Sequence, residues 1–160
     1  MVKGGVKSFA GFDFVLIGPI EPERGPGGAV REFMPQGRYA QADSTRLNPN
    51  GAGPFCKFSI ARGIDKPGVY VVTLGTDPVY AGMCVDLAKR WGQLGYGAIS
   101  PKNCFVGGQS TNCKVNNRVL ECSKAGGCLK LWFHQTTVAA SAERTVIRAF
   151  KPAWNARVPG

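Results

Sequence analysis

Residues 68–91 read GVYVVTLGTDPVYAGMCVDLAKRW, and the architecture expected for the second half of the chain follows from this stretch. GVYVVTL is rich in β-branched and aromatic residues, GTDP has the composition of a turn, and VYAGM resembles a second short strand. Two strands joined by so short a turn predict an antiparallel hairpin. CVDLAKRWGQL (residues 84–94) then has the apolar spacing of a helix, with Lys89 and Arg90 beside its apolar side.

Three further elements are expected after this hairpin and helix. Residues 112–127 predict a helix that stops near Gly126, residues 128–136 predict a third strand, and residues 141–150 predict a helix with Ser141 as its N-cap. The expected fold class is therefore α+β: a small three-stranded antiparallel sheet flanked by helices, in the order β-β-α-α-β-α.

The first 66 residues have a different composition, with clusters of glycine and proline such as PIEPERGPGG and LNPNGAGP. FDFVLIGPI (residues 12–20) and FCKFSIA (residues 55–61) have the aromatic and β-branched content of strands, and the segments around them predict loops. We therefore expect residues 1–66 to form an N-terminal extension of strands and long loops, packed on a core formed by residues 67–160.

The charge of the chain indicates a polyanionic partner. Twenty Lys and Arg face ten Asp and Glu, which gives a formal net charge of +10 and a pI near 9.6. The excess belongs mainly to residues 67–160, which hold eleven basic and four acidic side chains, against nine and six in residues 1–66. The alternative is that the charge serves only solubility.

Targeting signals and cysteines restrict the class of protein further. The first twenty residues hold one short apolar run, interrupted by Asp13, and resemble a signal peptide poorly. No run of roughly 20 apolar residues occurs, so we expect a cytoplasmic protein without a membrane partner. The six cysteines are then expected as free thiols, although a structural zinc site in residues 104–128 is an alternative that the absence of CxxC pairs disfavours.

Four side chains are candidates for chemistry, and each has an ordinary structural explanation. A hairpin brings Tyr70 and Tyr80 onto neighbouring strands, where both hydroxyls could reach one face or both rings could pack on the core. Arg90 fits a solvated helix position. Glu143 fits a partner for the dipole of a helix N-terminus.

The combination is more specific than its parts. GVY at 68–70, VYAG at 79–82, Arg90, Glu143 and Asn155 follow one another in an order and at a spacing that resemble the GIY-YIG nuclease superfamily. The resemblance covers residues 67–156, a little over half of the chain. It implies the β-β-α-β-α core of that family with one inserted helix.

The resemblance implies phosphodiester hydrolysis with one divalent metal ion, Mg²⁺ or Mn²⁺, and a role for each matched residue. Glu143 would be the metal ligand, because a hard cation prefers carboxylate oxygen and water. Arg90 would bind a non-bridging phosphate oxygen. Tyr70 would be the general base, and Tyr80 would bind the attacking water or a phosphate oxygen. Asn155 would orient the metal site or the helix of Glu143, and the products would carry 5′-phosphate and 3′-hydroxyl ends.

One expected feature of the family is missing. A His or Tyr usually follows the arginine by about four residues, and this position is Leu94 here. Tyr96 could take over the role of general base or phosphate ligand, or it could pack within its loop. His134, the single histidine, lies far from the motif in sequence, so we expect it to be structural.

A second group of residues is expected to contact double-stranded DNA. Residues 100–117 form a Gly-, Asn- and Ser-rich basic loop that leads into a helix, a combination that suits DNA phosphates and base edges; a solvated helix face is the alternative. The N-terminal extension could add further contacts. The predicted DNA-contacting residues are Lys89, Lys102, Gln109, Lys114, Asn116, Asn117 and Arg118.

The function expected from these patterns is a metal-dependent DNA endonuclease, with a site-specific, restriction-type enzyme as the more attractive form. Because a monomer with a single active site cuts one strand at a time, double-strand cleavage would imply a homodimer or sequential binding. Two other classes stay open: a non-catalytic nucleic-acid-binding protein on the same scaffold, and a zinc-stapled interaction domain.

Overall fold

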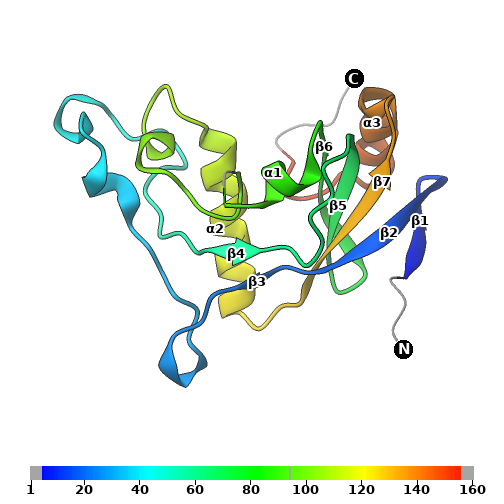
Figure 1. Ribbon diagram of the computed structural model, residues 1–160, viewed down its shortest axis with the longest axis horizontal. Helices are drawn as coiled ribbons and strands as arrows, with labels where there is room; N and C mark the ends of the chain where they lie inside the picture. The colour runs from blue at the N-terminus through cyan, green and yellow to red at the C-terminus, as the bar shows by residue number, and fades with distance from the viewer. Residues whose placement is uncertain (1–4, 94, 156–160) are drawn as a thin grey trace. The chain divides into compact units, whose positions relative to one another are not determined.

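The structure, a computed structural model, describes residues 5–93 and 95–155. Their contacts divide into two compact units. Figure 1 labels the helices and strands of each unit. The first, called the sheet unit, contains residues 5–20, 60–88 and 127–155. The second, called the helix unit, contains residues 21–59, 89–93 and 95–126. The boundary expected at residue 66 does not coincide with this division.

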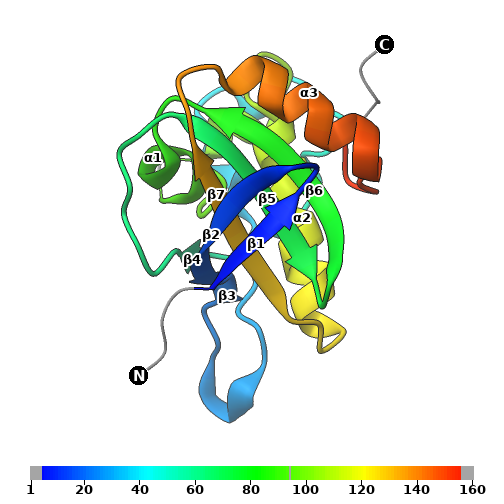
Figure 2. The same cartoon turned by 90° about the vertical axis from the view of Figure 1, so that its right-hand side faces the viewer.

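The sheet unit is built on five antiparallel strands in the order β1-β2-β7-β5-β6 (Figure 2). The prediction of a three-stranded sheet is therefore wrong, because residues expected in the N-terminal extension add β1 and β2 to it. Ala10 and Gly11 connect these two strands with φ values of 56° and 87°, the left-handed pair that a tight hairpin requires. The strands are β1 (Val6–Phe9), β2 (Phe12–Pro19), β5 (Gly68–Leu74), β6 (Asp77–Cys84) and β7 (Leu129–Gln135).

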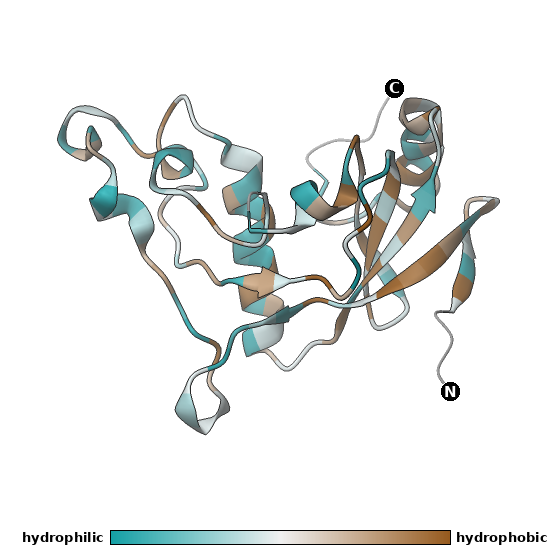
Figure 3. Cartoon of the chain, in the orientation of Figure 1, coloured by the Kyte–Doolittle hydropathy of each residue, from teal (hydrophilic) through white to brown (hydrophobic). Residues whose placement is uncertain are grey.

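The hairpin predicted from residues 68–83 is confirmed as β5 and β6. Tyr70 pairs with Gly82, Val72 pairs with Tyr80, and the register shifts by one residue just beyond Val72. All of β5 from Gly68 to Thr73 is buried, because β5 has neighbours on both sides and packing on both faces. The near-continuous apolar run GVYVV therefore reflects a central strand. Figure 3 shows hydrophobic residues concentrated on the strands of this sheet.

The helix predicted at residues 141–150 is confirmed as α3 (Ala139–Phe150), which lies against β5 and β6 (Figure 2). The prediction that Ser141 caps it is wrong, because the helix begins two residues earlier. The hydroxyl of Thr136 accepts a hydrogen bond from the Val138 amide (3.1 Å) just before the first turn. The core shared by α3 and the sheet includes Ala142, Val146 and Ile147 from the helix and Val69, Val71 and Ala81 from the strands.

The chain that follows α3 covers the outer edge of β6, which is the last strand of the sheet. Trp154 N–H donates to the Val79 carbonyl (2.9 Å). The Asn155 side chain pairs with Ala81 twice: its Nδ2 donates to the Ala81 carbonyl (2.8 Å), and its Oδ1 accepts from the Ala81 amide (3.1 Å). These bonds replace part of the ladder that an edge strand lacks.

The helix unit is organised around α2 (Ser110–Lys124), which confirms the helix predicted at residues 112–127. The second predicted N-terminal strand shrinks to β4 (Phe58–Ser59), which pairs with β3 (Glu21–Pro22) in a separate two-stranded sheet. Short 3₁₀ turns interrupt the loops: η1 (Pro26–Gly28), η2 (Pro35–Arg38), η3 (Ala42–Ser44) and η4 (Pro101–Cys104). One core cluster of this unit contains Phe55, Ile99, Cys104, Phe105 and Cys113.

The helix expected at residues 84–94 is much shorter, because α1 runs only from Leu87 to Trp91. The chain folds back directly after Trp91, and the Tyr96 amide donates to the Arg90 carbonyl (2.8 Å). Gly95 allows this approach, since a Cβ at that position would overlap the Arg90 carbonyl oxygen. Cys84, expected in the helix, is the last residue of β6, and Leu94 lies outside the described residues.

Candidate functional site

The two motif tyrosines lie side by side in the sheet unit. Their ring centroids are 5.8 Å apart at an interplanar angle of 48°, as the pairing of β5 with β6 requires for residues one diagonal step apart. Tyr70 is 1% exposed and Tyr80 is 8% exposed. Both rings therefore pack in the core, and a catalytic role for their hydroxyls stays a prediction.

Gly82, the last residue of VYAG, makes room for the Tyr70 ring. A Cβ on Gly82 would overlap the Tyr70 hydroxyl and the ring carbon that bears it. The two residues are direct cross-strand partners, so the Tyr70 ring packs directly over the Gly82 backbone. The contact with Tyr70 explains why a glycine occupies this position, whether or not the chain belongs to any family.

We expect Gly82→Ala to displace the Tyr70 ring and to lower the free energy of unfolding by about 1–3 kcal/mol, the usual cost of an overpacked core. Urea unfolding of the variant measures this loss. Gly37→Ala is the matched control, because a Cβ at Gly37 meets nothing within 4 Å. Equal unfolding free energies for the two variants would show that Tyr70 does not rest on Gly82.

Asn155 and its neighbour Trp154 attach the end of the α3 segment to the strand that carries Tyr80. The Trp154 ring lies 6.2 Å from the Tyr80 ring, and the Asn155 amide binds Ala81, the next residue of β6. Asn155 was expected to orient the metal site or the helix of Glu143. Its observed bonds give it a positioning role at the β6 edge, and Trp154, which the sequence reasoning overlooked, joins it there.

Glu143 lies on α3, one residue after Ala142, which packs in the core with Val69 and Val71. Tyr70 lies between these two valines in β5, so its side chain points to the opposite face of the sheet. Glu143 is partly buried and is the fifth residue of the helix. The dipole explanation weakens, because that effect is confined to the first turn and α3 has no acidic residue there.

Arg90 and Tyr96 meet within the helix unit. The Arg90 Nη1 atom lies 3.4 Å from the Tyr96 hydroxyl oxygen, and the guanidinium carbon lies 5.8 Å from the centroid of the same ring. Tyr96 is buried and packs edge-on against Trp91 at 4.8 Å. Tyr96 therefore supports the arginine side chain, which fits the loop-packing alternative better than a role as a base.

His134 belongs to the sheet unit and has a structural setting. Its Nδ1 donates to the Asp13 carbonyl (2.9 Å), and its ring lies 5.2 Å from Phe12 and 5.5 Å from Phe14. These contacts tie β7 to β2 at one point of their ladder. The prediction that His134 is structural agrees with this environment.

The predicted DNA-contacting residues all lie in the helix unit, and all except Asn116 have some exposure. Asn116 is 0% exposed, and its amide binds the backbone of Cys56 and Tyr96, so the prediction of a DNA contact at this position does not agree with the structure. The exposed members are Lys89 in α1, Lys102 in η4, Gln109 just before α2, and Arg118 in α2.

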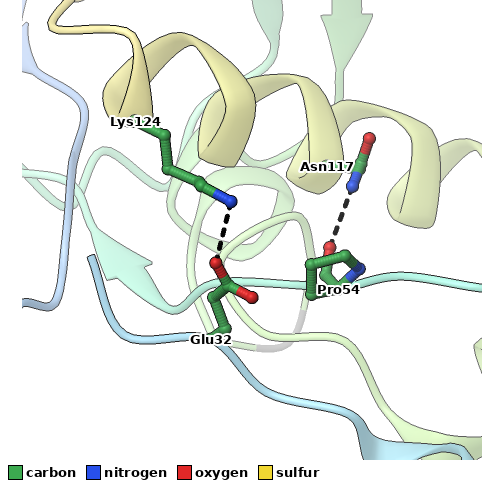
Figure 4. A network of polar contacts seen from close by, with 4 residues as sticks. All are labelled: Glu32, Pro54, Asn117 and Lys124. Carbon is green, nitrogen blue, oxygen red and sulfur yellow. Dashed lines mark hydrogen bonds and ion pairs between the residues drawn. The ribbon is translucent and has the colours of Figure 1, made fainter. Parts of the chain in front are cut away.

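One face of α2 borders a polar pocket with a volume of about 200 Å³. Lys114 and Arg118 are its two cationic residues, and partial burial, with the Arg118 charge adding to it, lowers the pKa of Lys114. Asn117 donates to the Pro54 carbonyl (2.9 Å), as Figure 4 shows. The pocket is lined by Pro49, Asn50, Ala52, Gly53, Lys114, Asn117 and Arg118.

The loop side of this pocket was not foreseen from the sequence. Residues 47–54 (LNPNGAGP) have the composition of a loop between strands, and nothing in that pattern shows that the loop folds onto a helix sixty residues away. Asn50 makes this contact, since its Nδ2 donates to the Ser110 hydroxyl (2.8 Å). The available signal was the presence of two asparagines, Asn48 and Asn50, and two glycines, Gly51 and Gly53, in one short loop.

The cysteines give no metal site among residues 5–93 and 95–155, where no group of three or more His, Cys, Asp or Glu side chains could hold an ion. All six thiols are free. Burial raises the pKa of Cys56 to about 12 and that of Cys113 to about 12, with the Cys104 thiol adding to the effect at Cys113. These thiols are therefore protonated and poor nucleophiles at neutral pH.

No protein-family model matches the chain, and neither the curated proteins nor the solved structures contain a match. Within the part of the chain that the structure describes, no helix combines the length and apolarity needed to cross a membrane.

Proposed function

We propose that this protein is a metal-dependent DNA endonuclease of the GIY-YIG type that leaves 5′-phosphate and 3′-hydroxyl ends. The observation that carries the proposal is the gathering of motif residues on one hairpin. Tyr70 and Tyr80 pack ring to ring, and Asn155, 75 positions after Tyr80, binds the residue that follows Tyr80. Glu143 comes from the helix that packs on the same two strands, on the sheet face opposite the Tyr70 ring.

The donor set agrees with a cation that is held mainly by water and substrate. Glu143 is a single, partly buried carboxylate, and Mg²⁺ typically takes one or two carboxylates and keeps several waters. Glu143 would hold the ion, and Mn²⁺ could replace Mg²⁺. When bound, the ion would polarise the scissile phosphate and stabilise the leaving oxygen.

The remaining roles are assigned to protein groups. Tyr70 would take the proton of the attacking water at its phenolic oxygen, and Tyr80 would hold that water or a phosphate oxygen. Arg90 would bind a non-bridging oxygen through its planar guanidinium, with Tyr96 restraining the side chain. Asn155 would fix the β6 edge beside Tyr80. Double-stranded DNA as substrate also fits the net positive charge.

Incubation with a mixed-sequence plasmid and Mg²⁺ tests this proposal, followed by sequencing of the ends. We expect cleavage that EDTA abolishes and ends that carry 5′-phosphates. Cutting of both strands at fixed positions would identify a site-specific enzyme acting as a homodimer or by sequential binding. Absence of metal-dependent cutting on duplex, branched and single-stranded DNA would contradict the proposal and favour a binding protein.

A further inference from the structure

We propose that the pocket between α2 and residues 49–54 is a phosphate-binding site, separate from the cleavage residues, that holds one phosphate of the DNA backbone. The phosphate chemistry follows from the pocket itself, and only the choice of DNA as its carrier rests on the proposed function. All of its lining residues belong to the helix unit.

The size of the pocket selects a small ligand. Its volume of about 200 Å³ is below the ~300–1,000 Å³ of pockets that enclose drug-sized ligands, and well above the space that one water needs. A phosphate group with accompanying water fits these bounds, and a whole nucleotide does not. The site therefore suits a group on a chain that continues outside it.

The charge of the pocket requires an anion. Lys114 and Arg118 lie one turn apart on α2, where like charges repel each other. None of the seven lining residues is acidic. Among the described residues, neither cation forms an ion pair. A bound phosphate would offset both the repulsion between the two cations and the desolvation cost of the partly buried Lys114 ammonium group.

A second lysine on the same face of α2 shows the contrast. Lys124 forms an ion pair with Glu32 (3.0 Å), and Figure 4 shows it projecting from the same side of the helix as Asn117. The Glu32 carboxylate raises the pKa of Lys124, whereas the pKa of Lys114 is lowered. At one end of this face the Glu32 carboxylate neutralises the Lys124 charge. At the pocket end no protein carboxylate among the lining residues does the same for Lys114 and Arg118, and a ligand could take this role.

The walls of the pocket are held before any ligand binds. Asn50 donates to the Ser110 hydroxyl (2.8 Å), and Asn117 donates to the Pro54 carbonyl (2.9 Å), so the loop is fastened to α2 at two points. From the other side, Gln36 Nε2 donates to two carbonyls of the same loop, at 2.9 Å each. Such preorganisation lowers the entropy cost of binding.

The test measures binding to a short DNA duplex in EDTA by fluorescence anisotropy, between about 50 and 200 mM NaCl. Lys114→Gln and Arg118→Gln should each weaken binding about 5- to 10-fold and reduce the slope of log K against log salt by about one. Lys124→Gln removes the same charge from the same helix and is the matched control, with an expected change below about twofold.

Two further measurements separate the outcomes. Urea unfolding should show Lys114→Gln to be at least as stable as the wild type, because the substitution removes a repulsion. If Lys114→Gln matches Lys124→Gln in binding both DNA and inorganic phosphate, the proposal is overturned. Titration with inorganic phosphate at constant ionic strength is the second. If Lys114→Gln abolishes phosphate binding yet binds DNA like Lys124→Gln, the ligand is a free phosphate and the DNA assignment is wrong.

The result does not depend on cleavage, since EDTA is present throughout and no motif residue is altered. A wild type that binds DNA through this pocket but cuts no substrate would contradict the endonuclease and leave the phosphate site standing. If the wild type cuts DNA, and Lys114→Gln binds both DNA and inorganic phosphate as Lys124→Gln does, the endonuclease is supported and the phosphate site is contradicted.

Discussion

Glu143→Gln is expected to lower the rate of metal-dependent DNA cleavage by about 100- to 1,000-fold, because loss of a group that stabilises charge in the transition state has costs of this size. Glutamine keeps the shape and the hydrogen-bonding oxygen of the side chain but not the charge that a hard cation requires. Binding of DNA in EDTA should change by less than about threefold, since removal of one negative charge from the protein slightly favours a polyanion.

The measurement is a single-turnover cleavage assay at saturating enzyme, which reports the chemical step separately from binding. Glu21→Gln is the matched control, because Glu21 is an exposed glutamate in β3 and the substitution removes the same charge. We expect the control to cut at the wild-type rate. Equal rates for Glu143→Gln and Glu21→Gln would remove Glu143 from the mechanism.

Asn116→Ala is expected to lower the free energy of unfolding by about 2–4 kcal/mol, because it leaves several buried polar groups without partners. The Asn116 side chain accepts from the Cys56 amide (2.8 Å) and donates to the carbonyls of Cys56 (2.9 Å) and Tyr96 (2.8 Å). No water can replace these bonds without entering a packed interior, since the side chain is fully buried.

Urea unfolding followed by circular dichroism measures this effect, with Asn117→Ala as the control on the neighbouring position. Asn117 makes one half-buried bond to Pro54, so its loss should cost about 1 kcal/mol. If both substitutions cost the same, Asn116 does not hold the segments of Cys56 and Tyr96 to α2. A smaller m-value for Asn116→Ala would indicate that part of the helix unit is already open before unfolding.

Local patterns predicted the elements that depend on neighbouring residues. The β5–β6 hairpin, β7, α2 and α3 were foreseen because alternation, turn composition and helical spacing act over a few residues. The place of β2 was not foreseen: residues 12–20 read as a strand, but Val15 pairs with Phe133, and nothing local encodes a partner so far along the chain. The early end of α1 likewise depends on Gly95 folding back on Arg90.

The candidate site shows the same limit. The spacing of Tyr70 and Tyr80 predicted a shared face, and the rings indeed lie together. The sequence prediction also grouped Asn116 with Lys114 and Arg118 as DNA-contacting residues. It could not show that Asn116 turns inward, because a buried asparagine is distinguished from an exposed one only by the backbone groups that it meets.

The bonds between Asn155 and Ala81 have a consequence for self-association. A primary amide has the donor and acceptor of a peptide unit, so this one side chain presents to β6 what a sixth strand would present. Together with the Trp154 amide on Val79, it occupies the positions through which a second copy of the chain could add its own strand. A segment placed in sequence beside the motif residues thereby also protects an exposed sheet edge from aggregation.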